Sequence, residues 1–254
     1  MLRWMPDKDF GRFPPEYLDE AVCYLTEFEV LTYDDLDWDD DNDYVHGFPR
    51  EYDNWKLFRE PEKVYVILQH DVDMFPERTL RVLELEADLG VKSNVMLFRD
   101  YHDRASLQIK GELVFEEYLT DAVIKGFQRF EKLGFVIGYH CNTYEQSGFD
   151  VGRAQDKAEG DVEYLRQFFR IKYYSPHGGV RDSNDKSNYI LTPPAGLRWV
   201  NNYHGITCDG FYSDSLLFRE NIRPKDYLET CEPGKRYQVL THPQHYHEVY
   251  ESWK

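Results

Sequence analysis

The stretch VYVILQHDVDMFPERTLRVLELE, residues 64–86, changes from an apolar run to a helical pattern at the four residues His-Asp-Val-Asp. Its first part is continuously apolar and rich in β-branched residues, which is typical of a strand covered on both faces. Its second part has Pro and Glu in a first turn and apolar residues at helical spacing up to Gly90, which predicts an amphipathic helix. His70, Asp71 and Asp73 therefore lie where a buried strand is expected to end.

The chain after residue 62 repeats this alternation of strand and helix. Strand-like runs occupy residues 92–98, 135–140, 171–177, 210–215 and 236–243, and helical patterns occupy residues 112–134 and 154–169. Repeated alternation predicts an α/β fold with a parallel sheet or barrel.

Residues 1–60 differ from this pattern. The segment 14–33 begins with two prolines, and its apolar spacing is compatible with one helix. The densest acidic run of the chain follows at residues 34–48, and we interpret it as a solvated loop because it lacks the Gly and Glu positions of a calcium-binding EF-hand loop. We expect an N-terminal helical and acidic extension over residues 1–60 and a main barrel domain over residues 61–254.

The composition excludes several classes of partner. With 47 acidic and 30 basic residues, the formal net charge is −17, which argues against a nucleic-acid backbone or an anionic lipid as the main partner. The N-terminus has no apolar signal region, and no apolar run is long enough to span a bilayer. The four cysteines lack C-x-x-C spacing, which favours reduced thiols over a thiolate metal site. These features predict a cytoplasmic protein without a membrane span.

Polar residues follow four of the predicted strands at the same relative position. These strands end in QHDVD, GYHCN, SPHGG and LTHPQHYH. Ligands and catalytic groups in parallel α/β folds gather at the carboxyl ends of the strands, because the following loops meet there. We therefore expect one rim to collect Asp71, Asp73, His140, His177 and His242.

This set of side chains is suited to metal-assisted hydrolysis. A carboxylate and two neutral imidazoles can hold a divalent metal such as zinc and leave a position open for water. Asp71 and Asp73 are two residues apart and so point to the same side of an extended segment, where one could bind metal while the other accepts a proton. Taken singly, Asp73 also fits a helix N-cap and His140 a hydrogen-bonded strand-end histidine. Their coincidence at four strand ends favours a site.

With these motifs, the chain resembles the polysaccharide deacetylase (NodB-homology) superfamily, carbohydrate esterase family four. The closer likeness is to its atypical branch, whose first motif reads His-Asp-Val-Asp and whose members occur in bacterial surface-polysaccharide, lipopolysaccharide and O-antigen biosynthesis. The resemblance covers roughly residues 62–250. It implies a distorted (β/α) barrel of about seven strands and a metal-dependent deacetylation of an N-acetylated or O-acetylated sugar. The expected metal is Zn²⁺, with Co²⁺, Mn²⁺ or Ni²⁺ as alternatives, and the expected substrate is a nucleotide-linked sugar or another glycan precursor.

The resemblance also implies roles for the rim residues. Asp71 corresponds to the general base and Asp73 to a metal ligand, although Val72 separates the two and the assignment could be the reverse. His140 corresponds to a second ligand, and His242 in LTHPQHYH corresponds to the catalytic acid.

The third ligand departs from the family pattern. Tyr144 stands where the family has its second metal-binding histidine. We expect His177 in SPHGG to replace that histidine, and Glu145 is the alternative. Two further residues are candidates for supporting or substrate-binding roles: Arg181, which follows His177, and Asp214 in FYSDS. For Asp214, an ordinary aspartate at a strand end is an equal alternative.

Two other functions stay open from the sequence. Another metal-dependent amidohydrolase or a phosphoesterase can use the same Asp and His ligands. A catalytically degenerate barrel that binds a glycan or a partner is the third interpretation. The missing second-motif histidine favours that interpretation, and the presence of both Asp71 and His242 opposes it.

Overall fold

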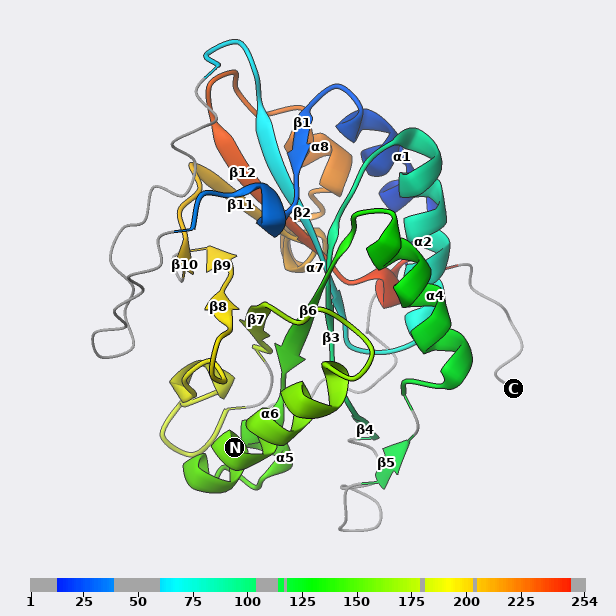
Figure 1. The fold of residues 1–254 in the computed structure, drawn as a ribbon. Coiled ribbons are helices and arrows are strands. Elements are labelled where there is room, and N and C mark those ends of the chain that lie inside the picture. Colours follow the sequence, from blue (N-terminus) through cyan, green and yellow to red (C-terminus); the bar gives the residue numbers. More distant parts are fainter. Residues whose placement is uncertain are drawn as a thin grey trace, which may run out of the picture.

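The central feature of the protein is a curved parallel sheet. A computed structural model describes residues 13–38, 60–103, 114–116, 118–178, 181–202 and 205–247. The sheet has the strand order β11-β12-β2-β3-β6-β7-β8, and every pairing along it is parallel. Its strands are β2 (Tyr65–Val72), β3 (Asn94–Leu97), β6 (Val136–Cys141), β7 (Tyr173–Pro176), β8 (Arg198–Trp199), β11 (Gly210–Ser213) and β12 (Arg236–Thr241). These seven strands curl into a half-barrel, which confirms the α/β class and the strand number expected from the sequence (Figure 1).

Helices cover the outer face of this half-barrel. They are α1 (Glu16–Leu25), α2 (Pro76–Leu89), α4 (Asp121–Lys132), α5 (Thr143–Gln146), α6 (Val151–Leu165), α7 (Ser215–Glu220) and α8 (Pro224–Leu228). Figure 1 shows α1, α2 and α4 stacked along one side of the sheet and α6 below them. Helix α2 begins at a proline and ends before Gly90, whose φ of 74° is readily adopted only by glycine. The predicted start and stop signals of this helix are confirmed.

Each central strand has one face toward these helices and one toward the interior of the half-barrel. All eight residues of β2 and all six of β6 are buried, as the continuous apolar runs predict. Outward side chains such as Val72 and Leu97 join the apolar core formed with α2, α4 and α6. Inward side chains such as Ile67 and Met96 form a second cluster that also contains Tyr33. The interior of the sheet is therefore a packed core below the rim.

The helix expected over residues 112–134 is shorter than predicted. Residues Val114–Glu116 form β5, which pairs antiparallel with β4 (Tyr101–Asp103), and α4 starts only after Thr120. Thr120 is extended, and its hydroxyl accepts a hydrogen bond from the backbone N–H of Val123 at 3.3 Å. A threonine N-cap therefore sets the start of the helix, although the helical pattern continues N-terminal to it.

The segment 14–33 is likewise more than one helix. Helix α1 ends at Leu25, and the chain continues into β1 (Glu29–Leu31) and a 3₁₀ helix at Tyr33–Asp35. Strand β1 pairs parallel with the first half of β2 and so belongs to the main sheet. Most of the acidic run lies outside the described residues, and the boundary expected near residue 60 stays a prediction.

Shorter elements complete the chain: β9 (Asn201–Asn202), β10 (Gly205–Ile206) and 3₁₀ helices at Asn188–Ile190 and Pro243–His245. All four cysteines are free thiols. Among the described residues, no helix combines the length and apolar character needed to cross a bilayer.

Candidate functional site

The carboxyl ends of four strands meet at one rim of the half-barrel. Strand β2 carries Asp71 and leads into Asp73, β6 carries His140, β7 leads into His177, and β12 leads into His242. Parallel pairing places these ends at the same edge of the sheet. The structure brings all five predicted rim residues together.

His70 belongs to the helix side of the sheet, although it lies in the same motif. Successive residues of a strand point to opposite faces, so His70 faces away from its two neighbouring aspartates. Its Nε2 lies 2.6 Å from Glu86 Oε1 in α2, and its Nδ1 lies 2.7 Å from Thr241 Oγ1. Ser93 Oγ donates to the other oxygen of Glu86 at 2.6 Å. This buried set is fully hydrogen-bonded and joins β2 to α2 and β12.

Asp73, His140 and His177 form a group with metal-ligand geometry. Their ligand atoms all lie within 4.8 Å of one another. Asp73 Oδ1 lies 3.3 Å from His140 Nε2, and Asp73 Oδ2 lies 3.5 Å from His177 Nε2. A tetrahedral zinc ion with bonds of about 2.0–2.1 Å holds neighbouring ligand atoms about 3.3 Å apart. The spacing of these residues therefore fits such an ion.

The hydrogen bonding of these atoms points the same way. Asp73 Oδ1 and His140 Nε2 are buried and have no hydrogen-bond partner despite their proximity. Buried polar atoms in native proteins are generally satisfied, so two such atoms that face each other without a hydrogen bond are suited to bind an ion or a water. The opposite nitrogen of His140, Nδ1, lies 2.9 Å from the carbonyl oxygen of Ser175, which directs Nε2 into the group.

Neighbouring charges shift the pKa values of His140 and Asp73. Burial lowers the pKa of His140, but the charges of Asp71 and Asp73 outweigh it, so the pKa is raised above its usual value. Burial raises the pKa of Asp73, but His177, His140 and His242 together hold that pKa well below its usual value. The two carboxylates therefore favour a proton on His140. A metal bound at this nitrogen would have to displace that proton, so its affinity would fall with decreasing pH.

Asp71 lies beside this group and has different partners. Its Oδ2 is 3.5 Å from His140 Nε2, and its Oδ1 accepts a hydrogen bond from Gln69 Nε2 at 2.5 Å. Asp71 is 4% exposed. One carboxylate of the motif thus contacts the histidines on several sides, while the other contacts one histidine and an amide.

His242 and Asp214 form a hydrogen-bonded pair next to Asp73. His242 Nδ1 lies 2.7 Å from Asp214 Oδ1, and the backbone N–H of His242 donates to Asp214 Oδ2 at 2.6 Å. His242 Nε2 faces Asp73 Oδ2 at 3.8 Å. Burial lowers the pKa of His242, but Asp214 and the more distant Asp73 and Asp71 raise it to about 10. His242 therefore carries a proton at neutral pH and presents it to the side where Asp73 lies.

His245 makes a second three-residue group with Asp214 and His242. Both oxygens of Asp214 are already used by His242, in contrast to the unpaired atoms of the first group. Burial, with a further effect from the charge of His242, lowers the pKa of His245 to about 4. This second group is better described as an ion pair with a neutral histidine beside it.

Phe98 is a site residue that the sequence did not single out. Its ring stacks on His140 with centroids 4.8 Å apart and meets the ring of His177 edge-on at 5.5 Å. It follows the end of β3 and is 5% exposed. Phe98 stands at the end of an expected strand, as the polar rim residues do. The sequence did not distinguish it, because an apolar residue at that position is typical of the hydrophobic core.

The other predicted residues lie apart from this group. Arg181 pairs with Asp185 at 3.0 Å, and its side chain is largely exposed. Glu145 in α5 is not among the three residues of the metal-ligand group. Tyr144, at the position where the sequence comparison expected a second histidine, donates its hydroxyl hydrogen to Asp182 at 2.7 Å. The structure thus places His177, and neither Tyr144 nor Glu145, beside Asp73 and His140.

Comparisons with known proteins found little overall similarity. No protein-family model matches the chain, and a search of curated proteins found no match. Among solved structures, the chain is similar to a CE4 esterase of Streptococcus mutans, with 16% sequence identity and a TM-score of 0.38. The match covers 78% of this chain and 81% of the esterase.

Proposed function

We propose that the protein is a metal-dependent hydrolase that removes an acetyl group from an N-acetylated or O-acetylated sugar. The observation that carries this proposal is the convergence of unpaired ligand atoms of Asp73 and His140, together with His177, beside the Asp214–His242 pair. The order of the strand-end motifs, which resembles that of polysaccharide deacetylases, supports an acetylated sugar as the substrate.

Asp73, His140 and His177 would hold the divalent metal, and zinc fits their carboxylate and imidazole donors. When bound, the metal polarises the acetyl carbonyl and makes water more acidic. Phe98 and the carbonyl of Ser175 keep the ring of His140 in the orientation that this role requires.

Asp71 acts as the general base in this proposal. Gln69 occupies Oδ1 of its carboxylate, so Oδ2, which faces His140, is the oxygen that takes a proton from the attacking water. Asp73 instead faces His140 and His177 and serves as a metal ligand, so the two carboxylates serve different purposes.

His242 acts as the general acid. Asp214 holds its Nδ1–H and keeps the imidazolium charged, so Nε2 gives its proton to the departing amine or hydroxyl. We further propose a cytoplasmic glycan precursor, such as a nucleotide-linked sugar for lipopolysaccharide or O-antigen synthesis, as the substrate.

Metal analysis combined with an acetate-release assay tests this proposal. We expect the purified chain to bind about one zinc per molecule and to release acetate, and neither phosphate nor ammonia, from a panel of acylated and phosphorylated sugars. Zinc at a hundredfold its Kd should stabilise the fold by about 2.7 kcal/mol.

His140→Ala and His177→Ala should lose both the metal and the activity, and Glu145→Ala is the matched control that should retain both. Stoichiometric metal in His140→Ala would rule out the ligand assignment. A wild-type chain with neither bound metal nor zinc-dependent stabilisation would instead favour a glycan-binding barrel without catalysis.

A further inference from the structure

Three buried polar side chains from distant parts of the sequence lie below Asp71. They are Tyr33, Gln69 and Gln238, and each is at most 1% exposed. The hydroxyl of Tyr33 donates to Gln69 Oε1, and Gln238 Nε2 donates to the same oxygen at 3.1 Å and to the Tyr33 hydroxyl oxygen at 2.9 Å. Gln69 Nε2 in turn donates to Asp71 Oδ1 at 2.5 Å. The set forms a continuous hydrogen-bonded path to the carboxylate.

The direction of this path is fixed from its far end. Gln238 Nε2 lies 3.2 Å from the carbonyl oxygen of Val200, which can only accept a hydrogen bond. The amide nitrogen of Gln238 must therefore face Val200 and Tyr33. With its hydroxyl oxygen accepting from Gln238, Tyr33 directs its hydrogen to Gln69 Oε1, which is much nearer than its other acceptor, the Val200 carbonyl oxygen at 3.4 Å.

The orientation of the Gln69 amide follows from these two donors. Reversing the amide would place its NH₂ group against the donors of Tyr33 and Gln238 and would leave buried groups unpaired, at a cost of about 1–3 kcal/mol each. Burial and the charge of Asp71 raise the pKa of the Tyr33 phenol well above its usual value, so this phenol keeps its proton. The N–H of Gln69 is thus held toward Asp71.

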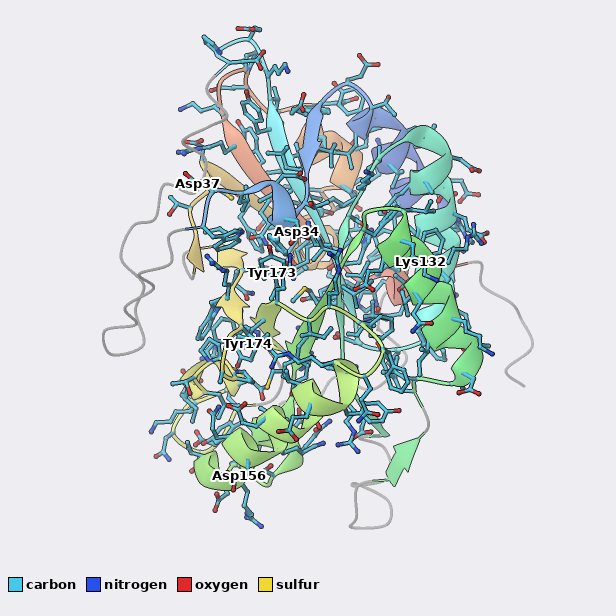
Figure 2. The ribbon with its side chains drawn as sticks, in the orientation of Figure 1. Asp34, Asp37, Lys132, Asp156, Tyr173 and Tyr174 are labelled. Carbon is cyan, nitrogen blue, oxygen red and sulfur yellow. The ribbon has the colours of Figure 1, made fainter. Side chains whose placement is uncertain are left out.

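Tyr33 is itself held firmly, although it comes from the N-terminal segment. Its backbone N–H donates to Asn94 Oδ1 at 2.7 Å, and its carbonyl oxygen accepts from the hydroxyl of Tyr173 at 3.0 Å. The neighbouring Asp34 also contacts the Tyr173 hydroxyl, at 2.7 Å, and the two residues lie side by side in Figure 2. The segment that precedes the barrel strands therefore reaches into the interior below the site.

We propose that Gln69 is a positioning residue for Asp71, and that Tyr33 and Gln238 fix the Gln69 amide so that its N–H always faces Asp71 Oδ1. This inference rests on the proposed function, in which Asp71 is the base. It assigns a role to the N-terminal segment, which supplies Tyr33. The consequence is that the Asp71 carboxylate cannot rotate freely and that Oδ2 stays toward His140, 3.5 Å away.

Gln69→Glu is the sharpest test, because it keeps an acceptor for Tyr33 and Gln238 and replaces the nitrogen that donates to Asp71 Oδ1, and at 3.4 Å to Ser175 Oγ, with an oxygen. We expect kcat to fall about 10–100-fold, as is typical when a supporting hydrogen bond is lost. KM and zinc stoichiometry should stay close to those of the wild type. Gln128→Glu is the matched control, since its amide donates to the Phe168 carbonyl outside the site, and it should leave kcat unchanged.

Variants of Tyr33 and Gln238 test whether these two donors fix the orientation of the Gln69 amide. Tyr33→Phe alone should lower kcat little, because Gln238 still donates to Gln69 Oε1. Tyr33→Phe combined with Gln238→Leu should lower kcat by more than the product of the two single effects, since only then is the amide free to turn. If Tyr33 and Gln238 have only a structural role, the variants should lose stability. The effect of the double variant on kcat should then equal the product of the two single effects.

A measurement without turnover separates this inference from the proposed function. In NMR spectra of the metal-free chain, the side-chain amide hydrogens of Gln69 should exchange slowly with solvent and shift in Asp71→Asn. No shift in that variant, or full kcat in folded Gln69→Glu, would overturn the inference. A wild-type chain that releases no acetate but shows the NMR signature would overturn the proposed function alone.

Discussion

At the scale of single residues, the partners of two aspartates distinguish otherwise equivalent side chains. Asp71 and Asp73 have the same chemistry and point to the same rim. Asp73 lies within 4 Å of three histidines, whereas Asp71 has one histidine and the amide of Gln69. A carboxylate surrounded by imidazoles can bind a metal ion together with them. A carboxylate with one oxygen hydrogen-bonded and the other facing the site can accept a proton.

The Asp214–His242 pair gives a prediction at the same scale. Asp214→Asn removes the negative charge that raises the pKa of His242 above its ordinary value. In the proposed mechanism, His242 acts as an acid only while it is protonated, so a lower pKa should move the alkaline limb of the kcat/KM profile to lower pH. We also expect activity at neutral pH to fall about 10–100-fold, which is the usual effect of losing such a supporting group.

A pH–rate profile of wild type, Asp214→Asn and the surface variant Asp226→Asn checks this. Asp226 pairs with Arg223 away from the site, so its variant should follow the wild-type profile. An unchanged alkaline limb in Asp214→Asn would show that Asp214 does not control the protonation of His242.

At the scale of elements, β6 packs closely against its neighbours just before the end that carries His140. A Cβ atom on Gly138 would lie 2.6 Å from Met96 Sδ and 3.2 Å from the carbonyl oxygen of Tyr173. Gly138 is two residues before His140 and points into the same packed interior. Gly138→Ala should therefore cost about 1–3 kcal/mol of stability through overpacking and should weaken zinc binding by displacing the end of β6.

Urea unfolding with and without zinc measures both effects. Gly160→Ala in α6 is the matched control, because nothing lies within 4 Å of its added Cβ and its backbone is helical. It should raise stability by about 0.5–1 kcal/mol through helix propensity and leave zinc binding unchanged. Equal stability of the wild type and Gly138→Ala would show that Met96 moves aside without cost.

At the scale of the whole molecule, the N-terminal segment packs with the barrel. Leu18 and Val22 of α1 are 1% and 0% exposed, and Leu25 packs with Val66 of β2 and Val239 of β12. Each fully buried side chain of this kind contributes about 1.5–3 kcal/mol. Removing several of them would therefore cost much of the free energy of unfolding, which is typically about 5–15 kcal/mol.

A chain that starts at residue 61 should therefore lose cooperative unfolding and zinc binding. A chain that starts at residue 13 keeps α1 and β1 and should behave like the chain of residues 1–254. Circular dichroism during urea unfolding and zinc titration compare the two. A cooperative transition and one bound zinc in the shorter chain would establish residues 61–254 as an independent domain.

The sequence alone determined the elements whose signals are local. The apolar run before His70 and the Pro and Gly signals around α2 predicted β2 and α2, because burial on both faces and helix termini leave marks in neighbouring residues. The strand-end positions of Asp73, His140, His177 and His242 followed from the rule that parallel strands present their carboxyl ends at one edge.

Other features depended on contacts between residues far apart in the chain. The helix predicted over residues 14–33 ends early, and residues Glu29–Leu31 form β1 instead, because pairing with β2 satisfies the backbone of this segment. A pairing partner elsewhere in the chain leaves no pattern in the local sequence. The path from Val200 through Gln238, Tyr33 and Gln69 to Asp71 joins residues up to 205 positions apart. Sequence spacing thus determined which side chains reach the rim, and only the tertiary structure decided their partners, because a hydrogen bond or a metal site depends on distances that the packed sheet sets.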